Sequence, residues 1–349
     1  MKKINFIFII LFFNTCMLSQ DKNERKLETK ADFRFAYIAD YNKKNSEFVV
    51  KNARFFIESK NYDNVSFRIM ADFSPLLSFS TRKDTINGRQ FLKEAQLSYN
   101  NVLLDAWIDA NFYKHNFIII GQFKVPFSIE NFLRSPMQIT FSNRTILLNR
   151  VYPELRDAGL YFMSKNIFYL PINFYLGAYN GEGLNKKQND KTINTSTRFE
   201  YVFLKKNMIS ADFYFGNLNK EEVYIFNLGS EINFGNLNIV LEGGNRHSIT
   251  NIKEYNKYGA YLDIKYAFEL EKNKLYSIRR IVPAIRLEYL EPDDLTIDDE
   301  FGKSTLGLKV FHNDEKNFET SFFYEYFVYK SSHSKNYFAL IFETRYWFY

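Results

Sequence analysis

The 349-residue sequence has little of what several protein classes require. Its single cysteine excludes a disulfide framework and cysteine-rich metal sites. Its four histidines leave little for histidine-based metal chemistry. Beyond the N-terminus no apolar run approaches the about 20 residues that a transmembrane helix needs, and the mean hydropathy is −0.33. A helical multispan membrane protein is therefore excluded.

Aromatic residues are abundant instead. The 38 Phe, 25 Tyr and 2 Trp make up 19% of the chain, and 46% of all residues are hydrophobic, which is too apolar for a disordered chain. The formal net charge of +6 comes from 46 Lys and Arg against 40 Asp and Glu. This mild excess does not identify a partner by itself.

The N-terminus predicts an export signal. Lys2 and Lys3 precede an unbroken apolar run over residues 6–13, and the small Ser19 precedes a charged stretch. This order is typical of a signal peptide, and the run is too short to span a bilayer. We expect cleavage after Ser19. The alternative is a lipoprotein signal in which Cys16 is acylated.

Apolar and polar side chains alternate from residue 32 onward, in segments of about ten residues separated by Asn, Lys, Asp and Gly. A period of two predicts β-strands. The pattern is clearest in residues 64–73, 102–112 and 256–268. In the second of these segments the predicted apolar face comprises Leu104, Ala106, Ile108, Ala110 and Phe112.

Sixteen such segments are present, and short connections alternate with long ones. An even number of strands with short turns on one rim and long loops on the other is typical of outer-membrane barrels. We therefore predict an all-β fold, a transmembrane antiparallel β-barrel of 16 strands in the outer membrane of a Gram-negative cell. Two stacked sheets are the alternative, and residues 90–99 are either a further strand or part of an inserted loop. The predicted organisation is a signal peptide at 1–19, a short lead-in at 20–31, and one barrel domain at 32–349 with long outer loops near 75–101, 128–156, 181–193 and 291–303.

The last strand is unusually aromatic. Its predicted outer face resembles the C-terminal strand by which outer-membrane barrels are recognised for insertion. The residues of this face are Phe338, Leu340, Phe342, Thr344, Tyr346 and Phe348.

A barrel of this size is wide enough for a water-filled lumen, so a pore is the expected function. Its wall is mixed in charge, but the stretch from Lys124 to Arg156 is basic and longer than a hairpin needs, which is typical of functional loops. Arginine suits an anion pathway because its charge is permanent and its donors form a planar fork. The alternative is that these arginines pair with carboxylates or contact lipopolysaccharide phosphates. The candidate pathway residues are Lys124, Arg134, Arg144, Arg150 and Arg156, with Arg54 and Arg68 on strands.

The run Gly-Gln-Phe-Lys-Val-Pro-Phe-Ser at 121–128, followed by Arg-Asp-Ala-Gly at 156–159, resembles the phosphate-selective porin family of Gram-negative outer membranes. Segments 105–107 and 179–183 also lie where that family keeps similar residues. The resemblance implies a sixteen-stranded barrel, usually a homotrimer, that passes anions through a basic constriction, with Lys124 facing the lumen. The acidic content of the wall departs from this pattern.

No nucleophile elbow, zinc-binding helix motif or phosphate-binding loop occurs in the sequence, so no catalytic residue, metal ligand or cofactor is expected. Acidic residues at 291–300 are either a divalent-cation site or a solvated loop. Basic and aromatic residues separate onto opposite faces, which argues against nucleic-acid binding. The expected partners are small anions such as phosphate, and outer-membrane lipid and lipopolysaccharide. A barrel enzyme acting on lipid and a non-conducting structural or adhesive surface barrel stay open as other functions.

Overall fold

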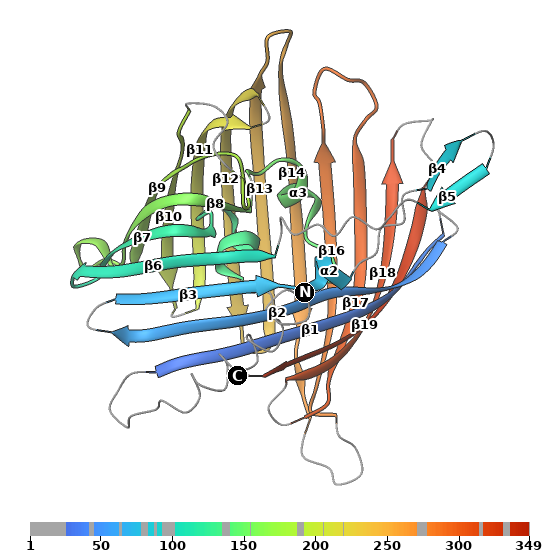
Figure 1. Cartoon of the computed structure of the whole chain (residues 1–349), viewed down its shortest axis with the longest axis horizontal. Helices are drawn as coiled ribbons and strands as arrows, with labels where there is room; N and C mark the ends of the chain where they lie inside the picture. Colours follow the sequence, from blue (N-terminus) through green and yellow to red (C-terminus); the bar gives the residue numbers. More distant parts are fainter. Residues whose placement is uncertain are drawn as a thin grey trace, which may run out of the picture.

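Sixteen antiparallel strands close into one barrel (Figure 1). Strand β1 (Lys26–Asp40) pairs with both β2 (Asn45–Tyr62) and β19 (Tyr337–Phe348), which leaves the sheet without a free edge. The short β15 continues β14, because both pair with β16. The predicted fold is confirmed. The other strands are β3 (Val65–Asp72), β6 (Leu103–Tyr113), β7 (Asn116–Lys124), β8 (Arg156–Ser164), β9 (Ile172–Tyr179), β10 (Asn194–Phe203), β11 (Asn207–Leu218), β12 (Glu221–Phe234), β13 (Leu237–Ile249), β14 (Glu254–Tyr266), β15 (Phe268–Glu269), β16 (Arg280–Glu291), β17 (Phe301–Phe311) and β18 (Phe318–Tyr329).

The computed structural model describes most of the chain after residue 25. The signal peptide at 1–19, Cys16 and the cleavage site after Ser19 lie outside the described residues. Residues 93–99, which belong to the segment 90–99 predicted as either a strand or part of a loop, also lie outside the described residues. The described ranges are 26–41, 45–62, 65–77, 83–86, 89–92, 102–134, 140–153, 155–186, 192–204, 206–218, 220–270, 278–313, 317–330 and 336–348.

Two boundaries differ from the sequence prediction. The first strand begins at Lys26 and not at residue 32, because residues 26–30 already pair with β2. The lead-in predicted at 20–31 is therefore partly strand. Strands β4 (Lys83–Ile86) and β5 (Arg89–Leu92) form a separate hairpin in the long β3–β6 connection and are no part of the barrel.

The apolar face of each strand points outward. In β19, Phe342 is 49% exposed whereas Trp347 on the opposite face is 6% exposed, as the C-terminal pattern predicts. In a barrel of the outer membrane, this outer face is the one that meets lipid. The two-residue turn between β12 and β13 has Gly235 at φ 57°, a left-handed conformation that glycine adopts without strain.

Leu104 corrects the predicted apolar face of β6. Met70 pairs with Asp105 while Ala71 pairs with Leu103, so Leu104 is one extra residue in the ladder. Such a bulge turns the extra side chain. Leu104 is accordingly buried, at 7% exposure, against Phe56 and Met70 inside the barrel.

The segment between β7 and β8 folds into the barrel in its described residues, 125–134, 140–153 and 155; we call these residues the inserted segment. Figure 1 shows its helical turn α3 (Ile146–Arg150) within the ring of strands. It also contains a π-helical turn, η2 (Ser128–Leu133). The other short helical pieces are α2 (Ser74–Leu77) and η4 (Ile167–Tyr169). Within the described ranges, no helix is long and apolar enough to cross a bilayer.

Apolar side chains attach the inserted segment to one side of the lumen. They form one cluster with inward-facing residues of β8 to β16, which is unusual for a wall that would otherwise be lined by water. The lumen is therefore filled on that side, and β1 and β2 face the other. The segment contributes Val125, Phe127, Ile129, Ile146, Leu147, Leu148, Val151 and Tyr152, and the wall contributes Tyr161, Tyr175, Tyr179, Tyr214, Val223, Ile225, Val240, Tyr261 and Leu290.

Candidate functional site

Wall carboxylates hold the start of the inserted segment. The backbone N–H of Ser128 donates to Asp212 (3.1 Å), and that of Ile129 donates to Glu242 (2.9 Å). Asn227 donates to both carboxylates, at 2.5 and 2.8 Å. Buried backbone N–H donors need hydrogen-bond acceptors, and a charged carboxylate forms a stronger hydrogen bond than a neutral acceptor does. The acids of the wall thus fix the entry of the segment.

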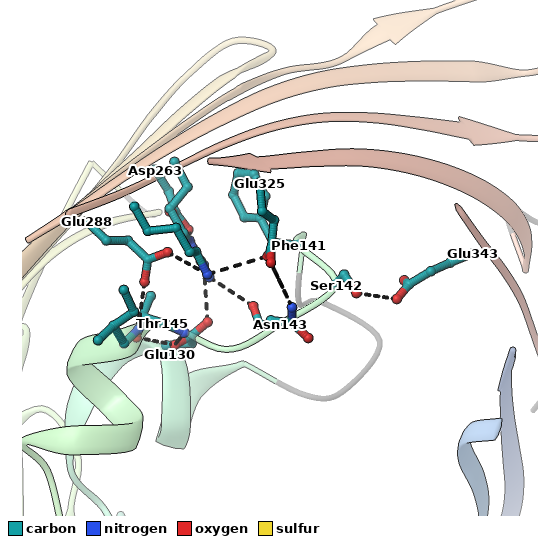
Figure 2. A network of polar contacts seen from close by, with 12 residues as sticks. Glu130, Phe141, Ser142, Asn143, Thr145, Asp263, Glu288, Glu325 and Glu343 are labelled. Carbon is teal, nitrogen blue, oxygen red and sulfur yellow. Dashed lines mark hydrogen bonds and ion pairs between the residues drawn. The ribbon is translucent and has the colours of Figure 1, made fainter. Parts of the chain in front are cut away.

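A second group of carboxylates holds the helical turn α3. Thr145 caps α3 by accepting from the Leu148 N–H (3.2 Å), and its hydroxyl donates to Glu130 (2.6 Å). The Ile146 N–H donates to Glu288 (2.6 Å). Figure 2 shows Thr145, Glu130 and Glu288 meeting at the start of this turn.

Glu130 is itself paired with a wall arginine. Arg286 of β16 bonds Glu130 (3.1 Å) and Asp263 (2.6 and 2.8 Å). Burial alone would raise the pKa of the Glu130 carboxyl, but the charges of Arg286 and Arg144 hold its pKa below the ordinary value. Glu130 is therefore ionised, and it ties the inserted segment to β16.

The tip of the inserted segment, residues 141–143, reaches the opposite wall of the lumen at β18 and β19. Phe141 packs against Phe323 of β18, with ring centroids 6.2 Å apart. Ser142 donates to Glu343 of β19, and the Asn143 amide donates to both oxygens of Glu325 (3.1 Å each). Figure 2 shows the two side chains directed at these carboxylates. The segment thus crosses the lumen.

Several wall acids, Asp212 and Glu288 among them, are also paired with wall cations. The mixed wall expected from the sequence is therefore present, but the charges described here largely neutralise each other in place. The ion pairs are Arg156–Asp105 (2.7 Å), Arg198–Asp212 (2.6 Å), Arg198–Glu200 (2.6 Å), Lys303–Glu288 (2.9 Å), Lys309–Glu319 (3.0 Å) and Arg345–Asp32 (2.7 Å).

A basic cavity remains between the tip of the inserted segment and the wall of β1 and β2; we call it the basic pocket. Its volume is about 370 Å³, and all of its lining side chains are polar. The lining residues are Arg34, Lys51, Asn52, Arg54, Ser142, Asn143, Arg144 and Asn149.

The four cations of the basic pocket differ in their partners. Arg34 and Lys51 share Glu343, at 2.8 Å from Nε and 2.9 Å from Nζ. Arg54 bonds Asp72 through Nε (2.6 Å). Arg144 has no hydrogen bond or ion pair with any described residue, and its buried Nη1 is without a partner. This buried donor is therefore unsatisfied within the described residues.

The structure brings four of the seven predicted pathway residues together. Arg54 and Arg144 line the basic pocket. Arg156 lies close enough to act electrostatically on both, but Asp105 neutralises it. Lys124 belongs to the same group, yet its ammonium donates to backbone carbonyls within the inserted segment.

The other three predicted residues lie elsewhere. Arg68 bonds Glu58 (2.7 and 3.0 Å), which also pairs with Lys30. Arg134 pairs with Glu231 (3.2 Å). Arg150 is exposed at the end of α3.

Sequence reasoning missed Arg34 and Lys51. The register between β1 and β2 shifts at Arg34, where Arg34 pairs with Asn52 and Phe35 pairs with Val50. Lys51 is the extra residue, so Lys51 and Asn52 both point into the lumen although they are adjacent in sequence. The break of alternation at Val49-Val50-Lys51-Asn52 was the available signal.

The acidic loop 291–300 is largely tied to lysines. Lys253 pairs with Asp293, and Lys330 pairs with Glu300 (2.6 Å) and Asp298 (3.3 Å). In the part of the chain that the structure describes, no group of three or more His, Cys, Asp or Glu side chains is arranged to hold a metal ion.

Solved structures share this fold at low sequence identity. The anion-selective porin from Comamonas acidovorans has 10% identity and a TM-score of 0.64, over 93% of this chain and 100% of that one. OmpT, an outer membrane protein of Vibrio cholerae in a trimer form, has 9% identity and a TM-score of 0.63 over the same shares. Salmonella typhi OmpF has 13% identity and a TM-score of 0.59, over 93% of this chain and 98% of that one. No curated protein sequence matches the chain.

A family model provides the sequence relationship that these structures lack. The model of phosphate-selective porin O and P matches residues 25–207. This range contains β1 to β10, the inserted segment and all seven candidate pathway residues. Because the match covers more than half of its length, the chain belongs to the phosphate-selective porin O and P family and is a porin of the outer membrane.

Proposed function

We propose that this porin lets small anions, phosphate among them, diffuse passively through the basic pocket. The observation that carries the proposal is the position of the four cations. Arg34, Lys51, Arg54 and Arg144 converge on one cavity, while the acids of the wall are occupied by the inserted segment or by other cations. A cluster of one sign between low-dielectric walls concentrates counter-ions.

Arg144 has the central role in this proposal. Burial lowers the pKa of its guanidinium to about 10, against the opposing effect of Glu130, so Arg144 stays charged at neutral pH. Without an ion-pair partner in the described residues, its charge acts on the lumen. Arg54, held by Asp72, is the neighbouring donor. Arg150, exposed at the end of α3, is proposed to attract anions towards the pocket.

Lys124 and Arg156 are proposed to support the pathway through their charge and not through direct contact with the solute. Their side chains are engaged by backbone carbonyls and by Asp105, respectively. They therefore add to the positive potential but have less capacity to contact the solute directly. Arg68 and Arg134, each paired with a carboxylate, are proposed to contribute least.

The test is the ion selectivity of the purified protein in planar lipid bilayers. We expect stable conductance steps and a reversal potential that shows anion preference. Arg144→Glu reverses a charge at the pocket and should shift the reversal potential towards cations. Lys114→Glu makes the same charge change in the exposed β6–β7 turn and is the control.

Two results would overturn the proposal. A barrel without conductance would support the structural or adhesive alternative instead. Equal reversal potentials for the wild type, Arg144→Glu and Lys114→Glu would show that the basic pocket does not set selectivity.

A further inference from the structure

The basic pocket has features that narrow the class of solute, if anions pass through it as proposed above. We propose that it preferentially binds divalent organic anions that carry hydroxyl groups, namely phosphate monoesters of small polyols, over inorganic phosphate. Charge, donor geometry, volume and lining polarity each support one part of this description.

The charge of the pocket matches a dianion. Four cations line it, and two carboxylates pair with them directly: Glu343 with Arg34 and Lys51, and Asp72 with Arg54. The lining itself contains four cations and no carboxylate, although Glu130, Glu325 and Asp32 also act on these cations from outside it, so the cavity favours a multiply charged anion. A phosphate monoester carries nearly two negative charges at neutral pH.

The free donors suit a phosphoryl group. The Arg144 Nη1 is buried without a partner, and the hydrogen bond from Arg54 to Asp72 uses Nε. Guanidinium groups bind phosphate oxygens in pairs of parallel hydrogen bonds. The Arg144 and Arg54 guanidinium groups on one cavity therefore present donors for a phosphoryl group, whereas the Lys51 ammonium already donates to Ser142 and Asn143 and pairs with Glu343.

The volume of the pocket exceeds what the phosphoryl group needs. A cavity of about 370 Å³ falls in the range of sites for organic molecules, about 300–1,000 Å³. Inorganic phosphate would leave much of it to water. A solute with an organic body would fill more of the cavity.

The lining of the pocket indicates that this body is hydroxylated. Sites for small molecules are usually lined by apolar and aromatic side chains, but no apolar side chain lines this one. The Asn52 amide already donates to Asp32 and the Asn143 amide to Glu325, whereas the exposed Asn149 amide has no such bond to a described residue and can both donate and accept. A hydroxyl group matches the Asn149 amide, whereas an alkyl body would find no apolar side chain to contact in this lining.

The experiment measures the block of single-channel current in planar bilayers containing the whole porin. The blockers are glucose 6-phosphate, inorganic phosphate, n-hexyl phosphate and glucose. We expect glucose 6-phosphate to half-block at a concentration about tenfold lower than inorganic phosphate and n-hexyl phosphate, by the strength of the added hydrogen bonds. Glucose, which is neutral, should not block.

Two variants separate the parts of the site. Asn149→Leu should raise the half-blocking concentration of glucose 6-phosphate and leave that of inorganic phosphate unchanged. Arg144→Gln should raise both about tenfold, as the loss of a charged donor predicts. Lys114→Gln, far from the pocket in sequence and located in an exposed turn, is the control.

The outcomes distinguish the two proposals. If inorganic phosphate or n-hexyl phosphate blocks as strongly as glucose 6-phosphate while anion preference persists, the solute class is wrong and the anion pathway stands. If the reversal potential shows no anion preference, both proposals fail.

Discussion

At the scale of single residues, the partner of a cation decides its role. Arg198 and Arg286 are buried, and each bonds two carboxylates, so they stabilise the wall. Arg144 is of the same type but forms no ion pair with a described residue: Glu130 acts on it only from beyond ion-pair distance, and its Nη1 has no hydrogen-bond partner. The type of residue alone does not separate these cases.

Lys124 gives a prediction at this scale. Its ammonium donates to the carbonyls of Asn131 (2.8 Å) and Arg134 (2.6 Å), which connects β7 to the inserted segment. Each hydrogen bond from a charged donor contributes about 1.5–3 kcal/mol. Lys124→Met should therefore increase hydrogen–deuterium exchange in residues 125–134 and lower the unfolding temperature in detergent.

The same variant should shift the reversal potential less than Arg144→Glu does. Lys114→Met is the control, because it removes a lysine that has no such bonds to the inserted segment. A Lys124→Met protein with unchanged hydrogen–deuterium exchange but without anion preference would show that Lys124 acts on the solute and does not hold the inserted segment in place.

The candidate site was only partly predictable at this scale. Arg54 and Arg144 could be selected because they are arginines on an inward strand position and in a long basic loop. Lys51 could not, because a bulge in β2 adds one residue and strict alternation does not place it. The partners of Lys124 are backbone carbonyls, which no residue pattern records.

At the scale of elements, the inserted segment determines the shape of the lumen. Its start, its helical turn and its tip are each bound to wall carboxylates, as described for Glu242, Glu288 and Glu343. The strands were predictable because a period of two needs only local residues. The fold of the segment was not, because its bonds join distant positions, such as Ser128 and Glu242, 114 residues apart.

Glu130 makes the inserted segment sensitive to acid. The pKa of its carboxyl is lowered, so it contributes stability above the ordinary pKa of glutamate, about 4.3, and this stability is lost as the pH falls through the lowered value. Single-channel recordings should show that the channel is less selective below about pH 4 than at pH 7.

At neutral pH, Glu130→Gln should show the reduced selectivity that is expected of the wild type below about pH 4. The reason is that the neutral amide cannot form an ion pair with Arg286. Glu254→Gln, at an exposed carboxylate of β14, is the matched control. A selectivity of Glu130→Gln that equals the wild type at every pH would exclude Glu130 as the anchor.

At the scale of the whole molecule, a single chain forms the whole closed sheet and its outward aromatic face, so one barrel is one protomer. We propose a homotrimer, as in the trimer form of the Vibrio cholerae protein with the same fold. Light scattering in mild detergent should give a protein mass of three chains. A monomer at all protein concentrations would contradict this proposal and leave the pocket of each barrel unaffected.

The ion pair between Arg34 and Glu343 joins the first and the last strand of the barrel. Arg34, one of the four cations of the basic pocket, therefore lies at the seam at which the sheet closes. A partly assembled barrel, with β19 not yet on β1, has no complete solute site and cannot hold the tip of the inserted segment at Glu343. Pairing of β19 with β1 therefore also completes the site, because Arg34 and Glu343 are brought together only by this pairing.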